Sequence, residues 1–264
     1  MKQFLLSKEQ AESILRDKKG FRLSGKEYHY LIRVLRFVQD DSFTGVDSAG
    51  NTYSLKVKSV TKEHALVTGE PAATLENEYE CPWTISLFQC LPKGKKMDTV
   101  IRQTTEAGAD KIIPVISEHS VSRPDEHSGS FKLERWEKIA VEATQQCGRP
   151  RPPEILQPKP FMQYEVELKK PNIGLFFHQE PLANSGLHGY LSNIPNVNTP
   201  VEIGIVIGPE GGLSDTEISR LNDWNYQPVY LGRRILRTET APVYALGAIQ
   251  TILLERNKWR HVKE

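Results

Sequence analysis

The chain has 264 residues, of which 38% are hydrophobic and 25% charged, so it is long enough for two ordinary domains and has the composition of a soluble globular protein. No apolar run approaches the ~20 residues of a membrane-spanning helix, and the amino-terminal residues lack the pattern of a signal peptide, so we expect a cytoplasmic protein. The net charge of +1 argues against a surface covered with phosphate-binding groups, and three scattered cysteines without a Cys-x-x-Cys pair favour neither a disulfide framework nor a metal site.

The first 71 residues predict a small β-barrel with one helix. Ser24 and Glu27 have the spacing of a capping box, and apolar residues recur at helical intervals from Tyr28 to Leu35. Alternating apolar and polar residues then predict strands at 42–46, 53–60 and 65–68.

The polar face of this predicted helix is basic. It presents His29, Arg33 and Arg36, and residues 1–70 carry 12 Lys and Arg against 9 Asp and Glu, a net of +3. Such a face suits contacts with RNA phosphates, although an ordinary solvated helix face has the same composition.

Residues 72–82 form a predicted linker, and residues 83–264 alternate strand and helix patterns. This alternation predicts an α/β domain with a parallel sheet covered by helices. The predicted strands are 83–90, 111–115, 173–177, 201–207 and 228–231; the helices include 96–107, 131–147 and 241–254, with loops at 122–130 and 148–160.

Two loops near the carboxyl end have the composition of a ligand site. Residues 208–212 (GPEGG) follow a buried strand and precede a capping box at Ser214 and Glu217, and the glycines let a ligand approach the backbone closely. The alternative for this loop alone is a plain tight turn. The second loop, 232–240 (GRRILRTET), mixes Arg, Thr and Glu with Ile and Leu before an apolar helix that Thr240 can cap, and such mixing suits a ligand cradle.

These segments resemble a known family. GPEGGLSDTEI and LGRRILRTETA are similar to the paired signature of the bacterial 16S ribosomal RNA uracil-N3 methyltransferases, which belong to the SPOUT class of S-adenosylmethionine enzymes. Further similar blocks are HYLIRVLR at 29–36, KGKKMDTVIRQTTEAG at 93–108 and ERWEKIAVEATQQCGR at 134–149. Gln103, Ala107 and Gln145 depart from the family pattern, which affects expected RNA contacts more than cofactor binding.

The resemblance implies a fold and a cofactor site. The fold would be a PUA-like RNA-binding β-barrel at 1–71 followed by an α/β SPOUT domain at 83–264 with a deep carboxy-terminal trefoil knot. Three loops would bind S-adenosyl-L-methionine, without metal, through Phe177, His178, Gly208, Pro209, Glu210, Gly211, Gly212, Leu231, Gly232, Ile235, Leu236 and Thr240.

The resemblance also implies an RNA substrate and a catalytic segment. The partner would be 16S rRNA in the small ribosomal subunit, and the enzyme a homodimer, with which the almost wholly apolar last helix agrees. The expected RNA contacts are His29, Arg33, Arg36, Lys93, Lys95, Gln146 and Arg149. Arg237 is the candidate donor to the uracil oxygens, oriented by Thr238 and Glu239, because a guanidinium suits that role better than an ammonium.

Three alternatives remain open at this level. Arg237 and Glu239 could form an ion pair with no catalytic part. The enzyme could methylate tRNA or 23S rRNA instead. The chain could also be a noncatalytic RNA-binding assembly factor that keeps the fold.

Overall fold

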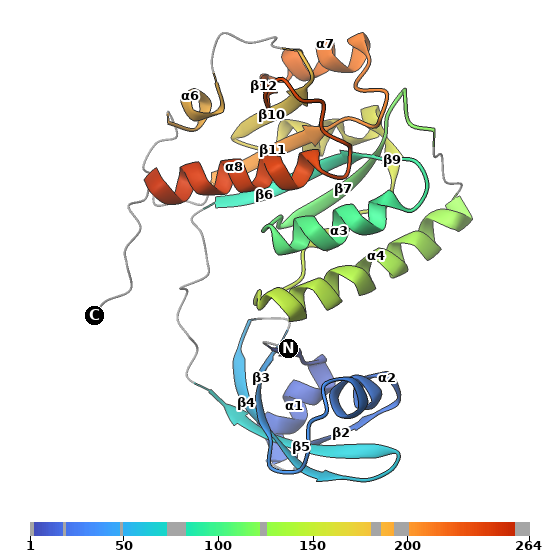
Figure 1. Ribbon diagram of the computed structural model, residues 1–264, viewed down its shortest axis with the longest axis vertical. Helices are drawn as coiled ribbons and strands as arrows, with labels where there is room; N and C mark the ends of the chain where they lie inside the picture. Colours follow the sequence, from blue (N-terminus) through green and yellow to red (C-terminus); the bar gives the residue numbers. More distant parts are fainter. Residues whose placement is uncertain are drawn as a thin grey trace. The chain divides into compact units, whose positions relative to one another are not determined.

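The computed structural model describes residues 3–17, 20–47, 50–72, 83–121, 126–180, 186–192 and 201–256, and divides into two compact units (Figure 1). The first unit comprises residues 1–80 and 141–152, and the second comprises 81–140 and 153–264. Most of the predicted linker at 72–82 and the start of the predicted loop at 122–130 lie outside the described residues. Within the described part, no helix combines the length and the apolar composition needed to span a bilayer.

The first unit is built on a five-stranded sheet of order β1-β3-β4-β5-β2. Side chains alternate along the first part of β4, where Tyr53, Leu55 and Val57 are buried and Ser54, Lys56 and Lys58 are exposed, as expected for a sheet with one face on a core. The elements are β1 (Phe4–Leu5), α1 (Lys8–Asp17), β2 (Phe21–Ser24), α2 (Gly25–Tyr28), a π-helix (His29–Val34), β3 (Ser42–Val46), β4 (Thr52–Val60) and β5 (His64–Pro71).

Three details of this unit differ from the sequence predictions. Ser24 stands at the N-cap of α2 but its side chain makes no capping hydrogen bond, so the predicted capping box is absent. The helix ends at Val34, and Arg36 follows it with φ at 61°, so Arg36 does not share a helix face with His29 and Arg33. The sequence analysis also missed α1, whose start is fixed by reciprocal hydrogen bonds between Ser7 and Gln10.

The second unit is a parallel sheet of order β12-β10-β11-β6-β7-β8, with β9 also paired to β7, as the strand and helix alternation predicted. Its strands are β6 (Trp83–Cys90), β7 (Lys111–Ile116), β8 (Glu154–Ile155), β9 (Lys159–Pro160), β10 (Ile173–His178), β11 (Val201–Ile207) and β12 (Tyr226–Tyr230). Its helices are α3 (Lys96–Glu106), α4 (Glu126–Cys147), a 3-10 helix (Phe161–Tyr164), α5 (Glu165–Lys169), α6 (Leu187–Ser192), α7 (Asp215–Asp223) and α8 (Ala241–Arg256).

Two hydrophobic cores cover the two faces of this sheet. Successive residues of β11 point to opposite faces, so Ile205 joins the core under α3 and α8 whereas Val206 joins the core that includes Leu221 of α7 (Figure 1). A glycine is required at Gly204, because a Cβ there would lie 2.6 Å from the buried hydroxyl oxygen of Tyr226. Pairing with β10 on one side and β6 on the other brings the end of β11 to the carboxyl edge of the sheet.

The helix α4 begins earlier than the sequence predicted. It begins at Glu126 rather than at residue 131, so the second half of the predicted loop at 122–130 is helical. The predicted loop at 148–160 contains the two-residue strands β8 and β9, which are too short to leave a sequence signal among its prolines.

Candidate active site

Three loops meet at the carboxyl edge of the parallel sheet. Phe177 is paired with Ile207 across β10 and β11, and His178 with Tyr230 across β10 and β12, so the three strands end at one level. The loops that follow enclose a cavity of about 370 Å³, a size in the range of small-molecule sites. It is lined by Lys96, Phe177, His178, Gln179, Ile207 through Leu213, Leu231, Gly232, Arg234, Ile235, Leu236, Arg237, Thr238 and Ala241.

The strand order explains why the cavity forms at this position. The connection after β6 leads through α3 to β7 on one side, whereas the connection after β11 leads through α7 toward β12 on the other. Because the two connections diverge from neighbouring strands, they leave a crevice at the carboxyl ends, where parallel α/β sheets bind their ligands.

Hydrogen bonds at the start of α7 fix the chain directly after the glycine loop. The predicted capping box forms at α7, with the Glu217 amide donating to Ser214 Oγ and the Ser214 amide donating to the Glu217 carboxylate. The same buried carboxylate also accepts the Glu118 amide at 2.9 Å, which ties the loop after β7 to α7. Gly212 has φ at 73°, a left-handed conformation that favours glycine.

A buried hydrogen-bond chain joins the glycine loop to the loop after β12. Thr238 is 5% exposed, and its Oγ1 donates to the Gly208 carbonyl oxygen at 3.1 Å. The same Oγ1 accepts a hydrogen bond from Gln89 Nε2 at 3.2 Å, and Gln89 is itself fully buried at the end of β6. Three separate segments are therefore fixed to one another beneath the cavity.

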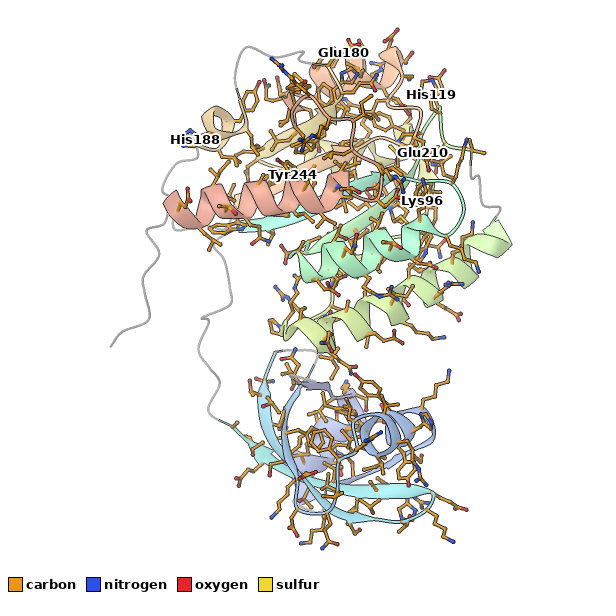
Figure 2. The ribbon with its side chains drawn as sticks, viewed as in Figure 1. Lys96, His119, Glu180, His188, Glu210 and Tyr244 are labelled. Atoms are coloured by element: carbon orange, nitrogen blue, oxygen red, sulfur yellow. The ribbon has the colours of Figure 1, made fainter. Side chains whose placement is uncertain are left out.

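Ion pairs at the rim of the cavity make a second connection between the glycine loop and the loop after β12. Lys96 Nζ lies 2.8 Å from Glu210 Oε1 and 3.5 Å from Glu239 Oε2, and Figure 2 shows Lys96 beside Glu210. The hydrogen bond to Glu210 raises the pKa of Lys96. Burial alone would raise the pKa of Glu210, but hydrogen bonds from Lys96 and from the Lys93 amide outweigh it and lower that pKa.

Arg237 lies at the cavity with its guanidinium exposed. Its backbone is fixed, because its carbonyl oxygen accepts the amides of Thr240 at 2.8 Å and Ala241 at 2.9 Å at the start of α8. The sequence left open an ion pair between Arg237 and Glu239, and this pair does not form. Glu239 pairs with Lys96 instead, and no described carboxylate pairs with Arg237. Thr238 bonds to Gly208 and Gln89 and has no described bond to Arg237.

The structure brings together most of the residues predicted for the cofactor. All of them line the cavity except Thr240, whose carbonyl oxygen instead accepts the first helical bond of α8 from Tyr244. Of the predicted catalytic residues, Arg237 and Thr238 line the cavity, and Glu239 reaches its rim through Lys96. The sequence analysis did not assign to the site Lys96, Gln179, Ile207, Leu213, Arg234 and Ala241. Of these, Lys96 was detectable because it begins α3 at the end of the connection from β6, on the side of an α/β sheet where ligands bind.

The predicted RNA contacts fall in both units. His29, Arg33 and Arg36 are exposed in the first unit, and Lys93 and Lys95 are exposed in the loop after β6 of the second. Gln146 and Arg149 group with the first unit, so their orientation toward the cavity stays a prediction. Among the described residues, no three His, Cys, Asp or Glu side chains are grouped as metal ligands would be.

Known proteins match most of this chain. Residues 79–250 match the sequence family described as an RNA methyltransferase domain. The chain is 34% identical over 231 residues to a Ribosomal RNA small subunit methyltransferase E of Synechocystis sp., covering 88% of this chain and 73% of that protein. It is 33% identical over 238 residues to the protein of that name from Bacillus subtilis, covering 89% and 91%. Its structure resembles that of a Ribosomal RNA small subunit methyltransferase E from Neisseria gonorrhoeae bound to S-adenosyl methionine, with a TM-score of 0.75 and 28% identity over 96% of this chain and 98% of that one.

Proposed function

We propose that this chain transfers a methyl group from S-adenosylmethionine to N3 of a uridine in 16S rRNA. The premise is that the chain belongs to the RNA methyltransferase family of the ribosomal RNA small subunit methyltransferases E. The observation that carries this proposal is the convergence of the three loops that the family resemblance assigns to the cofactor on one cavity at the carboxyl edge of the sheet. We expect the enzyme to act in the cytoplasm on the small ribosomal subunit.

The cavity suits S-adenosylmethionine in its chemistry. Ile207, Leu231 and Leu236 offer apolar surface for a base, and the backbone of the glycine loop offers polar groups without side chains in the way. At Gly208 a Cβ would stand 3.1 Å from the backbone of Gly212, so a larger residue there would require the loop backbone to shift. These features support binding of the cofactor by this loop.

The reacting groups divide the chemical work. The bound sulfonium supplies the methyl group and its own leaving group. Uracil N3 must give up its proton to a base or to water as the bond from N3 to the methyl carbon forms and the bond from sulfur to that carbon breaks. The chain must also align N3 with the methyl group, and alignment alone can lower such a barrier by ~7 to 11 kcal/mol. We assign to Arg237 the stabilisation of negative charge on the uracil carbonyl oxygens. Arg237 is exposed at the cavity, its backbone is held by two hydrogen bonds, and its guanidinium has no carboxylate partner among the described residues.

The domain assignments are part of the proposal. We assign residues 1–71 to a PUA-like barrel that contacts RNA through His29, Arg33 and Arg36, residues 72–82 to a linker, and residues 83–264 to a SPOUT domain whose carboxyl end forms a trefoil knot. The five-stranded sheet of the first unit and the exposed basic residues of its π-helix and of the segment after it support the first assignment. A homodimer is supported by the apolar composition of α8, where Tyr244 is 54% exposed.

Nucleoside mass spectrometry of ribosomal RNA tests the proposal. A strain that lacks the gene should lose 3-methyluridine from 16S rRNA and regain it with the wild-type gene. Loss of a methylated nucleoside from tRNA or 23S rRNA would assign another substrate, and an unchanged set of nucleosides would indicate a noncatalytic assembly factor.

A further inference from the structure

Lys96 connects two segments of the cavity that are far apart in the sequence. It is the first residue of α3, and its side chain lines the cavity. Its ammonium contacts Glu210 of the glycine loop and Glu239 of the segment that carries Arg237. A single cation therefore lies between the two loops that we assign to the cofactor and to catalysis.

The carboxylates on either side depend on this cation. Glu239 Oε2 is buried and has no hydrogen-bond partner, and Lys96 is its one cationic partner among the described residues. Glu210 also accepts a hydrogen bond from the Lys93 amide, at 3.2 and 3.3 Å. Because Lys93 lies just before α3, that bond does not connect Glu210 to the segment that carries Glu239. Without Lys96, Glu210 and Glu239 would lose the cation that both contact.

We propose that Lys96 is a positioning residue that holds the glycine loop (208–212) and the segment 231–240 in the relative placement that binds the cofactor and presents Arg237. This proposal rests on the proposed function, because it concerns the same cavity. It differs from the family resemblance in assigning a role to a residue outside both signature loops.

The fold does not depend on this contact alone. The buried chain from Gln89 through Thr238 to Gly208 joins the same two segments beneath the cavity, and it does not include Lys96. We therefore expect Lys96→Met to fold but to lower the thermal midpoint, because the carboxylate of Glu239 loses its cationic partner while the buried chain remains.

The expected effect on binding is moderate. Lys96→Met should weaken S-adenosylmethionine binding about fivefold, near the upper limit for a partly exposed ion pair. Lys96→Arg should keep most of the affinity, because a guanidinium can still bridge two carboxylates. In a double-mutant cycle, Glu239→Gln should weaken binding much less in the Lys96→Met background than in the wild type, since the two residues act through one contact.

Lys111→Met provides a matched control. Lys111 pairs with Glu154 at 3.0 Å and is about as exposed as Lys96, but it lies at the opposite, amino end of β7. This variant removes one surface ion pair of the same unit away from the cavity, so it should bind the cofactor as the wild type does.

Calorimetry and hydrogen exchange on the full chain test the proposal. Titration with S-adenosylmethionine should show the loss in Lys96→Met, its recovery in Lys96→Arg and no loss in Lys111→Met. Amide exchange of the cofactor-free protein should be faster at residues 231–240 in Lys96→Met only. Equal affinity and equal exchange in Lys96→Met and Lys111→Met would overturn the inference. Failure of the wild type to bind the cofactor would instead overturn the proposed function, and the exchange experiment would still test the contact.

Discussion

Replacement of Arg237 by alanine should separate catalysis from cofactor binding. The guanidinium is exposed at the cavity and pairs with no described carboxylate, so its removal leaves no buried charge behind and should change the free energy of unfolding by less than about 0.5 kcal/mol. The backbone bonds from Thr240 and Ala241 remain, so the segment keeps its shape. If the guanidinium stabilises charge that develops only in the transition state, kcat should fall by ~10² to 10³ while the cofactor Kd stays the same.

Single-turnover methylation of small ribosomal subunits, paired with calorimetry, measures both quantities. Arg237→Lys should recover little of the rate, because an ammonium on a flexible stem does not reproduce the planar donor pair. Arg220→Ala is the matched control, since Arg220 is an exposed arginine of α7 that pairs with Asp223 and does not line the cavity. An Arg237→Ala variant that turns over normally, or that fails only because it no longer binds the cofactor, would refute the assignment.

Three further predictions concern the buried chain, the basic surface and the rim. Thr238→Val should lower the free energy of unfolding by about 1 to 3 kcal/mol in urea titrations, because it leaves the Gly208 carbonyl without its donor, whereas Thr238→Ser should restore most of it; a fully stable valine variant would argue against the bond. Arg33→Ala and Arg36→Ala should each lower the salt slope of RNA binding by ~1 if each residue contacts one phosphate, and an unchanged slope would indicate a solvated surface. The pKa of Glu210 is lowered from its usual 4.5, so the contribution of its carboxylate to thermal stability should be present above pH 4.5 and disappear as the pH falls through the lowered value. Thermal unfolding of the wild type and of Glu210→Gln across pH 3 to 7 measures this contribution as a difference in midpoint. Equal midpoints at pH 6 would contradict the prediction.

Local patterns in the sequence identify the parts of the site that are continuous along the chain. Val201 to Ile207 is a run of β-branched and apolar residues ending on glycine, and Ser214 and Glu217 have capping-box spacing, so the strand, loop and helix start follow from neighbouring residues. The same kind of pattern misleads at Ser24, where Gly25 adopts φ at 57° and the predicted cap does not form. Capping spacing indicates a helix start only when the backbone around it is free to adopt the capped geometry.

Contacts between distant residues account for what the sequence could not show. Lys96 and Glu210 are 114 positions apart, and Gln89 and Thr238 are 149 apart, so their bonds depend on the order of strands in the sheet. The helix pattern predicted α3, but no local pattern indicated that Lys96 would contact Glu210 and Glu239. Similarly, the local Arg237 and Glu239 spacing suggested a pair that the structure replaces with one from α3.

The most direct test of the central claim is reconstitution with purified components. The wild-type protein should transfer a labelled methyl group from S-adenosylmethionine to isolated small ribosomal subunits, with 3-methyluridine as the product in 16S rRNA and no added metal. Arg237→Ala should bind the cofactor under the same conditions and form the product at least about a hundredfold more slowly. Labelled methyl groups on another nucleoside or another RNA, or none at all with a protein that binds the cofactor, would contradict the account.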